Sequence, residues 1–228
     1  MTSPEQHRRL GDARNSIGRL LAAYADARPS STGLPRREDV GFERLKPLLG
    51  WEFLAEWVAP ASIVVRLSGA HIDYVLGRNV TGQNFFDNYR PEQRTVYARF
   101  FGAIADHSCG GYSVRRVIVN GAEAFDYHSI YLPLAPRPDY VPIVGAVAVT
   151  GFERVAHGAS SDAAPDFQAL SRLGVFDIGH GVPDGALAGL EPIDIGAVVA
   201  TIDGAGELAL DKLAYDTRSS VGRPRTAG

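Results

Sequence analysis

The sequence has very little cysteine and no surplus of positive charge. Its 228 residues include one cysteine, Cys109, which excludes an intrachain disulfide and a zinc cage of thiolates and fits a reducing cytosol. The 23 basic side chains are outnumbered by 26 acidic ones, so the net charge is −3. This balance provides no sequence-independent attraction to nucleic acid or to anionic membranes, and we expect neither as a partner.

Long apolar runs are also missing. No stretch reaches the roughly 18 apolar residues that a membrane span requires, and the charged first residues lack the apolar core of a secretion signal. We therefore expect a cytoplasmic protein. Its length allows one or two domains with a buried core.

Residues 1–28 are predicted to form an amphipathic helix. A capping sequence starts at Ser3, with Pro4 in the first turn. Apolar residues then recur at three- and four-residue steps: Leu10, Ala13, Ile17, Leu20, Leu21 and Tyr24. An isolated helix of this length is marginal in water, so its apolar stripe must be buried on the main domain or on a second copy. We expect a homodimer through this helix.

Residues 34–153 are predicted to form the main domain. Strands are expected at 51–58 and 62–68, then short helices, a longer helix that begins at Pro91, and strands at 112–119, 123–134 and 142–152. This order predicts an α+β fold: a five-stranded antiparallel sheet with short helices on one face, preceded by the N-terminal amphipathic helix.

Residues 154–228 form an extension rich in glycine and proline. Within it we expect short helices at 166–173, ended by Gly174, and at 207–215. The apolar run 193–202 fits a strand. These features do not define a known fold for the extension.

Five short motifs occur in a characteristic order along the main domain. They are LPRRED at 34–39, LKPLL at 45–49, VRLSG at 65–69, LGRNVTG at 76–82 and LPL at 132–134. Together they make the chain resemble the PAS superfamily, and more narrowly a set of bacterial stand-alone PAS-like proteins. The resemblance implies a sensory or protein-interaction module of signal transduction, whose sheet and helices enclose a small ligand or dock a signalling partner. It implies no reaction.

A binding site in such a domain is expected between the sheet and the covering helices. The residues expected to contribute are Leu67, His71, Phe100, Ile104, Arg115, Tyr127, His128 and Ile130. Arg115 shares strand parity with Val117, so an inward Val117 brings its guanidinium toward a ligand carboxylate. The alternative, with Arg116 inward or both arginines solvated, stays open.

Metal and cofactor chemistry find little support in the sequence. Asp126 and His128 are the best pair of possible metal ligands, but no third ligand stands at a suitable spacing. The long helix has its only histidine at its end, which argues against haem, and Cys109 is misplaced for a flavin adduct. We therefore expect no metal, no cofactor and no catalytic activity, only an unidentified small ligand.

Two other classes of function stay open. One is an enzyme on a small α+β fold with a general base, for which the candidates are Asp73, Asp87, Asp126 and His128. The other is a protein-interaction scaffold whose interior is filled by side chains.

Overall fold

The computed structural model describes residues 15–29, 33–40, 50–119, 122–150, 166–182 and 190–203. Its elements are α2 (Ser16–Ala27), β1 (Glu52–Val58), β2 (Ser62–Ser68), α4 (Ala70–Leu76), η2 (Phe85–Asn88), α5 (Pro91–His107), β3 (Gly110–Val119), β4 (Ala122–Pro133), β5 (Val141–Thr150), β6 (Asp166–Phe176), β7 (Glu191–Pro192) and α6 (Ile195–Asp203). The helix expected at 207–215, and the part of the N-terminal helix before residue 15, lie outside these residues.

The strands form one sheet in the order β2-β1-β5-β4-β3-β6-β7. The first five are antiparallel neighbours, as expected. The prediction of a five-stranded antiparallel sheet is nevertheless wrong in two respects. The sheet has seven strands among the described residues, and β7 runs parallel to β6.

For β6 and α6, the last strand and helix of substantial length, the observed secondary structure is the opposite of the predicted one. The helix expected at 166–173 is strand β6, and the strand expected at 193–202 is helix α6. Gly174 does not end a helix: a methyl group there would overlap the carbonyl oxygen of Glu191, so glycine allows β7 to approach. Asp194 caps α6 through its Oδ1, which accepts the Ala197 N–H at 3.1 Å. A short apolar run fits both a buried strand and a buried helix, which explains the wrong prediction.

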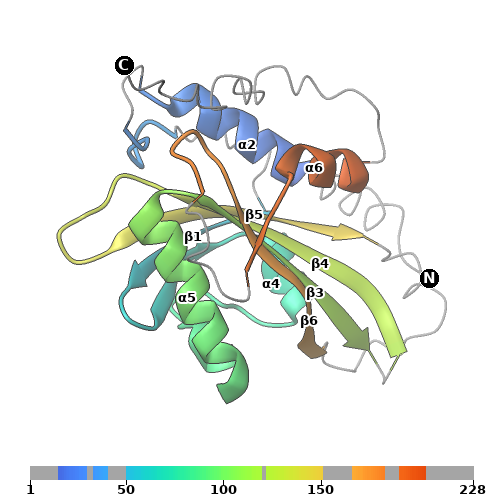
Figure 1. The fold of residues 1–228 in the computed structure, drawn as a ribbon. Coiled ribbons are helices and arrows are strands. Elements are labelled where there is room, and N and C mark those ends of the chain that lie inside the picture. The colour runs from blue at the N-terminus through green and yellow to red at the C-terminus, as the bar shows by residue number, and fades with distance from the viewer. Residues whose placement is uncertain are drawn as a thin grey trace, which may run out of the picture.

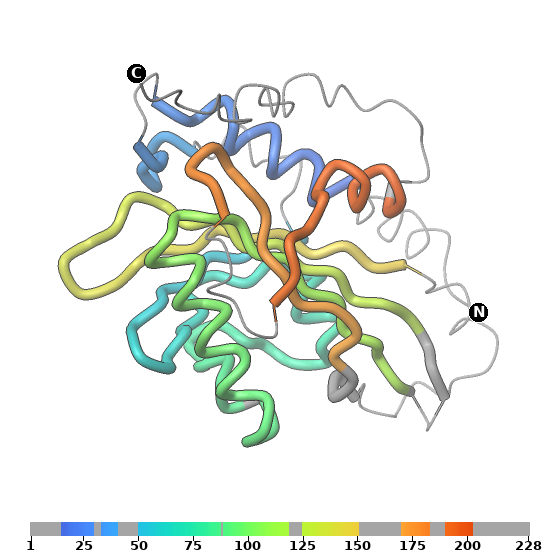
Figure 2. Tube along the Cα trace, viewed as in Figure 1, coloured from blue at the N-terminus to red at the C-terminus, as the bar shows by residue number. Residues whose placement is uncertain are grey.

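Helices cover both faces of the sheet (Figure 1). We call the face under α4, η2 and α5 the inner face, and the face under α2 and α6 the outer face. The short helices expected on one face, α4 and η2, do lie together on the inner face with α5, whereas α2 and α6 cover the outer face. Figure 2 shows that the two outer helices come from opposite ends of the described chain, blue for α2 and red for α6.

The apolar stripe of α2 is buried on the chain's own sheet. Ile17, Leu20 and Tyr24 belong to the same core cluster as Ile130 of β4 and Val144 of β5. The stripe is therefore covered without a second copy, and the predicted homodimer through this helix stays a prediction.

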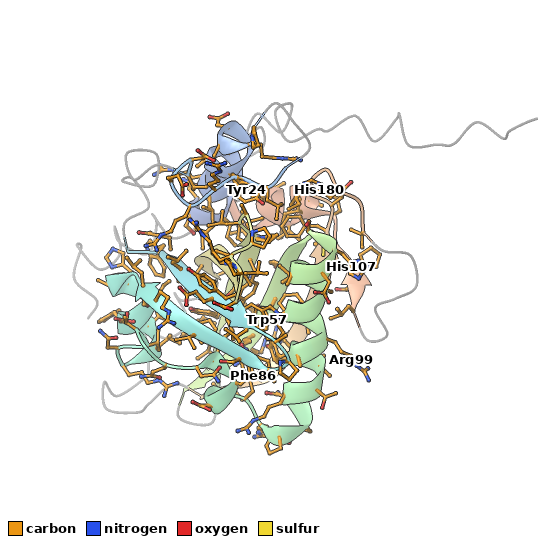
Figure 3. The ribbon with its side chains drawn as sticks, turned by 90° about the vertical axis from the view of Figure 1, so that its left-hand side faces the viewer. Tyr24, Trp57, Phe86, Arg99, His107 and His180 are labelled. Atoms are coloured by element: carbon orange, nitrogen blue, oxygen red, sulfur yellow. The ribbon has the colours of Figure 1, made fainter. Side chains whose placement is uncertain are left out.

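Two polar contacts fix α2 and the loop after it. Tyr24 Oη donates to the Pro133 carbonyl oxygen at 2.5 Å. Arg28 donates from Nη1 to the Ile178 carbonyl oxygen, and its Nη2 lies 3.3 Å from His180 Nε2. Figure 3 shows His180 on the same side of the sheet as Tyr24. The N-terminal helix is thus linked to the chain that follows β6.

The Tyr24 hydrogen bond leads to a first prediction. We expect Tyr24→Phe to lower the free energy of unfolding by about 1–2 kcal/mol, because the Pro133 carbonyl loses its buried donor. Urea unfolding followed by circular dichroism measures this loss. Tyr74→Phe is the matched control, because the Tyr74 side chain is exposed, and it should change stability by less than about 0.5 kcal/mol. Equal effects of the two variants would contradict this role of Tyr24.

Candidate functional site

Neighbouring residues of β3 point to opposite faces of the sheet. Arg115 lies on the inner face, with its guanidinium against Tyr97 of α5. Arg116 lies on the outer face, where its Nε is 2.9 Å from Asp126 Oδ1 of β4. Arg115 therefore faces inward with Val117, and Arg116 does not; that Arg115 contacts a ligand carboxylate stays a prediction.

The Arg115 guanidinium is enclosed by tyrosines. Its Nε and Nη2 each donate to Tyr97 Oη at 2.9 Å. Its Cζ lies 4.3 Å from the ring centroid of Tyr89 and 5.0 Å from that of Tyr97, within the range of cation–π attraction. The two tyrosine rings are stacked, with centroids 3.9 Å apart. Arg115 as a whole residue keeps some solvent exposure.

The charges of this cluster are well defined. Burial lowers the pKa of Arg115, but the facing Tyr89 and Tyr97 more than offset this, so its pKa is raised and the guanidinium stays charged. Burial raises the pKa of Tyr97 to about 12 and that of Tyr89 well above its ordinary value. A charged guanidinium that faces phenol groups can form charge-assisted hydrogen bonds to an anion.

The α4 end of the inner face carries two more of the predicted residues. Tyr127 of β4 pairs with Arg115 across the strands, and its buried hydroxyl lies near the Asp73 carboxylate. The His71 ring packs on Trp51, with centroids 5.2 Å apart. The structure thus brings His71, Arg115 and Tyr127 to one face of the sheet.

Phe100 and Ile104 lie on the helix that covers this face. Both are fully buried against the strand residue Gly111. A methyl group at Gly111 would lie 2.6 Å from Phe100 Cζ and would overlap Ile104 Cδ1. These two side chains therefore fix the distance between α5 and the sheet.

Three of the predicted site residues lie elsewhere. Leu67 is 47% exposed on the edge strand β2, because a register shift between Leu54 and Ala55 of β1 interrupts the alternation there. His128 and Ile130 follow Tyr127 at odd spacings on β4, so they point to the outer face. Ile130 packs in the outer cluster with α2.

His128 has a structural environment on the outer face. Its Nδ1 is 2.8 Å from Tyr112 Oη, and its Nε2 is 2.9 Å from Thr150 Oγ1. Burial lowers the pKa of His128 to about 4, and nearby Asp126 offsets only part of this effect. The imidazole is therefore neutral at pH 7, with one ring nitrogen as donor and the other as acceptor.

The residues considered as general bases are divided between the two sides of the sheet. Asp73 on the inner side accepts hydrogen bonds from Ser68 Oγ at 2.7 Å and from the Val80 N–H at 3.3 Å. Asp126 and His128 lie on the outer face. Asp87 lies exposed on η2, on the inner side like Asp73.

The described residues provide no cluster of metal ligands, no ionised thiol and no helix suited to span a membrane. Among the described residues no group of three His, Cys, Asp or Glu side chains is placed to hold a metal ion. Burial raises the pKa of Cys109 to about 11, so the thiol stays protonated. None of the described helices combines the length and the apolar character that crossing a membrane requires.

Tyr89 and Tyr97 are the site residues that the sequence does not reveal. Tyr97 belongs to the apolar stripe of α5 and is expected there as a core residue. Tyr89 follows η2, in a turn without a motif. A tyrosine at either position signals a binding role only once Arg115 is known to face it.

Comparison with known proteins agrees with this architecture. A family model described as PAS domain matches residues 14–148, which is more than half of the chain and includes α2. No curated protein matches the chain. The match ends before β6, so β6, β7 and α6 lie outside it. The chain belongs to the PAS domain family.

Proposed function

We propose that this chain is a non-catalytic sensory or regulatory module of bacterial signal transduction, which binds a small carboxylate on the inner face at Arg115. The observation that carries this proposal is the charged Arg115 guanidinium among the neutral hydroxyls of Tyr89 and Tyr97. Membership of the PAS family supports a sensory role in general terms.

A carboxylate suits this site for electrostatic reasons. Hydrogen bonds between a guanidinium and a carboxylate are charge-assisted, and the planar fork of arginine matches both carboxylate oxygens. The attraction is stronger in a partly desolvated interior than in water. We propose that the ligand enters where Arg115 is partly exposed.

Strand β3 connects the ligand-binding side of the sheet to the helices on its opposite face. Arg115 and Arg116 are neighbours on β3, and the outer face of this strand lies in one cluster with α2 and α6. A ligand shifts the arrangement of these helices to the extent that it binds one arrangement more tightly. The outer helices are thus the elements we expect to signal to a partner protein in the cytoplasm.

A homodimer through α2 belongs to the same proposal. The surface that α2 leaves outside the core consists of Asn15, Arg19, Ala22 and Asp26. A second copy must contact this outward side, because the apolar stripe is already buried. The mass of the intact protein tests whether a dimer forms at all.

Native mass spectrometry of the full chain, together with titration calorimetry using benzoate, tests the proposal. We expect a dimer that binds one benzoate per chain. Arg115→Ala should weaken binding about 30-fold or more, because a buried charge pair is lost. Arg116→Ala is the matched control, an adjacent arginine on the opposite face, and should bind as the wild type does.

Arg115→Lys is a second variant, which keeps the test decisive if Arg115→Ala does not fold. It keeps the positive charge and loses the planar fork, so we expect intermediate affinity. If benzoate leaves the wild-type protein unaffected, or if Arg115→Ala and Arg116→Ala behave alike, the carboxylate site is wrong. A protein that carries no small molecule would favour the scaffold function instead, and a monomeric mass would remove the homodimer.

A further inference from the structure

Arg28, the residue after α2, is bound by the loop that follows β6. Its Nη1 donates to the Ile178 carbonyl oxygen, and its Nη2 lies 3.3 Å from His180 Nε2. A methyl group at Gly179, where φ is +98°, would overlap the guanidinium, so glycine allows this close approach. The contacts join segments that are 150 residues apart in the sequence. We call Arg28, Ile178 and His180 the α2 latch.

The loop holds its own half of the latch in a fixed shape. Asp177 Oδ1 accepts the backbone N–H groups of residues 179, 180 and 181 at distances of 2.5 to 3.0 Å. The Ile178 side chain is buried in the outer core cluster, which includes Val198 of α6. The loop therefore presents two positioned acceptors, the Ile178 carbonyl oxygen and the His180 ring nitrogen.

Two other hydrogen bonds hold α2 at points away from the latch. Ser16 Oγ donates to the Val147 carbonyl oxygen at 2.5 Å, and Tyr24 Oη donates to the Pro133 carbonyl oxygen. Neither bond involves a group that changes its charge between about pH 5 and pH 8, whereas a histidine does. A change of pH in this range therefore acts on the C-terminal end of α2 and leaves these two bonds in place.

The latch requires a neutral His180. Arginine is a donor only, so His180 Nε2 accepts the hydrogen bond and the ring proton lies on Nδ1. Protonation puts a hydrogen on Nε2 as well, which removes the acceptor and places two positive charges face to face. The charged groups that face this ring in the described part of the chain are Arg28 at the end of α2 and Asp177 in the same loop.

These neighbours set the direction of the histidine's titration. Burial is the largest influence and lowers the pKa of His180; Arg28 lowers it further, and Asp177 offsets part of the effect. His180 is nevertheless an exposed residue, so solvent protons reach it without unfolding of the chain. The contact is therefore intact above about pH 6.5, the ordinary value for histidine, and is lost as the pH falls below it.

We propose that the α2 latch is a pH-sensitive conformational switch, which holds the C-terminal end of α2 on the loop after β6 and releases it when His180 is protonated. The loop lies beyond the part of the chain that matches the PAS family, whereas α2 lies within it. The added segment thus controls a helix of the family domain. This inference does not depend on the carboxylate site.

Amide hydrogen exchange of the full chain at pH 7.5 and pH 5.0 tests the release, with each rate divided by the intrinsic rate at that pH. His180→Gln keeps an acceptor but does not titrate. We expect the last-turn amides 25–28 of the wild type to lose about three- to tenfold more protection on acidification than the same amides of His180→Gln, the effect of one hydrogen bond. His107→Gln, at the exposed end of α5 (Figure 3), is the matched control and should behave as the wild type does.

An NMR titration of the His180 ring provides a second, independent measurement. We expect the ring to titrate below the ordinary pKa of histidine in the wild type, and at a higher pH in Arg28→Gln, because this variant removes the facing charge. Equal losses of protection in the wild type and in His180→Gln would overturn the proposal. So would a His180 titration that Arg28→Gln leaves unchanged.

Discussion

Gly145→Ala is expected to destabilise the fold by about 3 kcal/mol or more, through overpacking of the inner core. Gly145 lies on β5, opposite Phe53 of β1 and Tyr131 of β4. A methyl group there would overlap the Phe53 ring and the Ile130 carbonyl oxygen. The Phe53 ring packs edge-on against Tyr131, with centroids 5.5 Å apart, and the carbonyl belongs to the sheet, so neither moves easily.

Gly102→Ala is the matched control for this prediction. Gly102 lies inside α5, and an added methyl group there meets no atom within 4 Å. Because alanine is the better helix former, this variant should stabilise the protein by up to about 1 kcal/mol. Urea unfolding of both variants measures the two effects. Effects of the same sign would contradict the arrangement of Phe53 over Gly145.

Acidification from pH 7 to pH 4.5 is expected to lower the free energy of unfolding by about 2–3 kcal/mol through His128. Burial lowers the pKa of His128 to about 4, whereas a histidine in the unfolded chain titrates near 6.5. Between these values the unfolded state binds the proton and the folded state does not. Stability is therefore fully present above pH 6.5 and is lost as the pH falls toward 4.

His128→Gln isolates this effect in unfolding measurements across that pH range. Glutamine does not titrate, so the difference in acid sensitivity between wild type and variant reports His128 alone. This comparison matters because Glu52 acts in the opposite direction: burial raises the pKa of its carboxyl, so protonation there favours the folded state. His107→Gln, at the exposed end of α5, is the control and should retain the full loss. Acid sensitivity unchanged in His128→Gln would contradict the buried, neutral state of this histidine.

Local elements of the fold were predictable because they depend on residues close together in the sequence. Pro91 occupies the first turn of α5, and β2 spans 62–68 as its alternation predicts. The pairing of β3 with β4 is also as expected. Each of these features follows from backbone geometry within a few residues.

The faces of the sheet were less predictable, because both are buried. Hydrophobicity separates the two sides of a strand only when one side meets water. Ile130 of β4 and Val147 of β5 are equally apolar, yet Ile130 packs under α2 and Val147 belongs to the inner cluster. The cover provided by α2 and α6 is a tertiary feature that neither strand encodes.

The candidate site was predictable only in part for a similar reason. The inward position of Arg115 could be predicted from strand parity, because this argument needs only one neighbouring residue, Val117, as a reference. The stacking of Tyr89 on Tyr97 depends on the turn after η2 and on the position of α5. The buried Trp51 Nε1–H has no hydrogen-bond partner among the described residues, and this depends on the side chains packed around it, so it has no signature in the sequence.

Amide chemical-shift mapping by NMR, with isotope-labelled full chain and benzoate, tests the central claim most directly. The claim is that a carboxylate ligand binds at Arg115 on the inner face. We predict large shifts for the amides of Arg115, Tyr127 and His71, and smaller ones for exposed positions of α5 such as Arg99, which points away from the sheet in Figure 3. A spectrum that does not change, or shifts confined to the exposed side of α5, would contradict the claim.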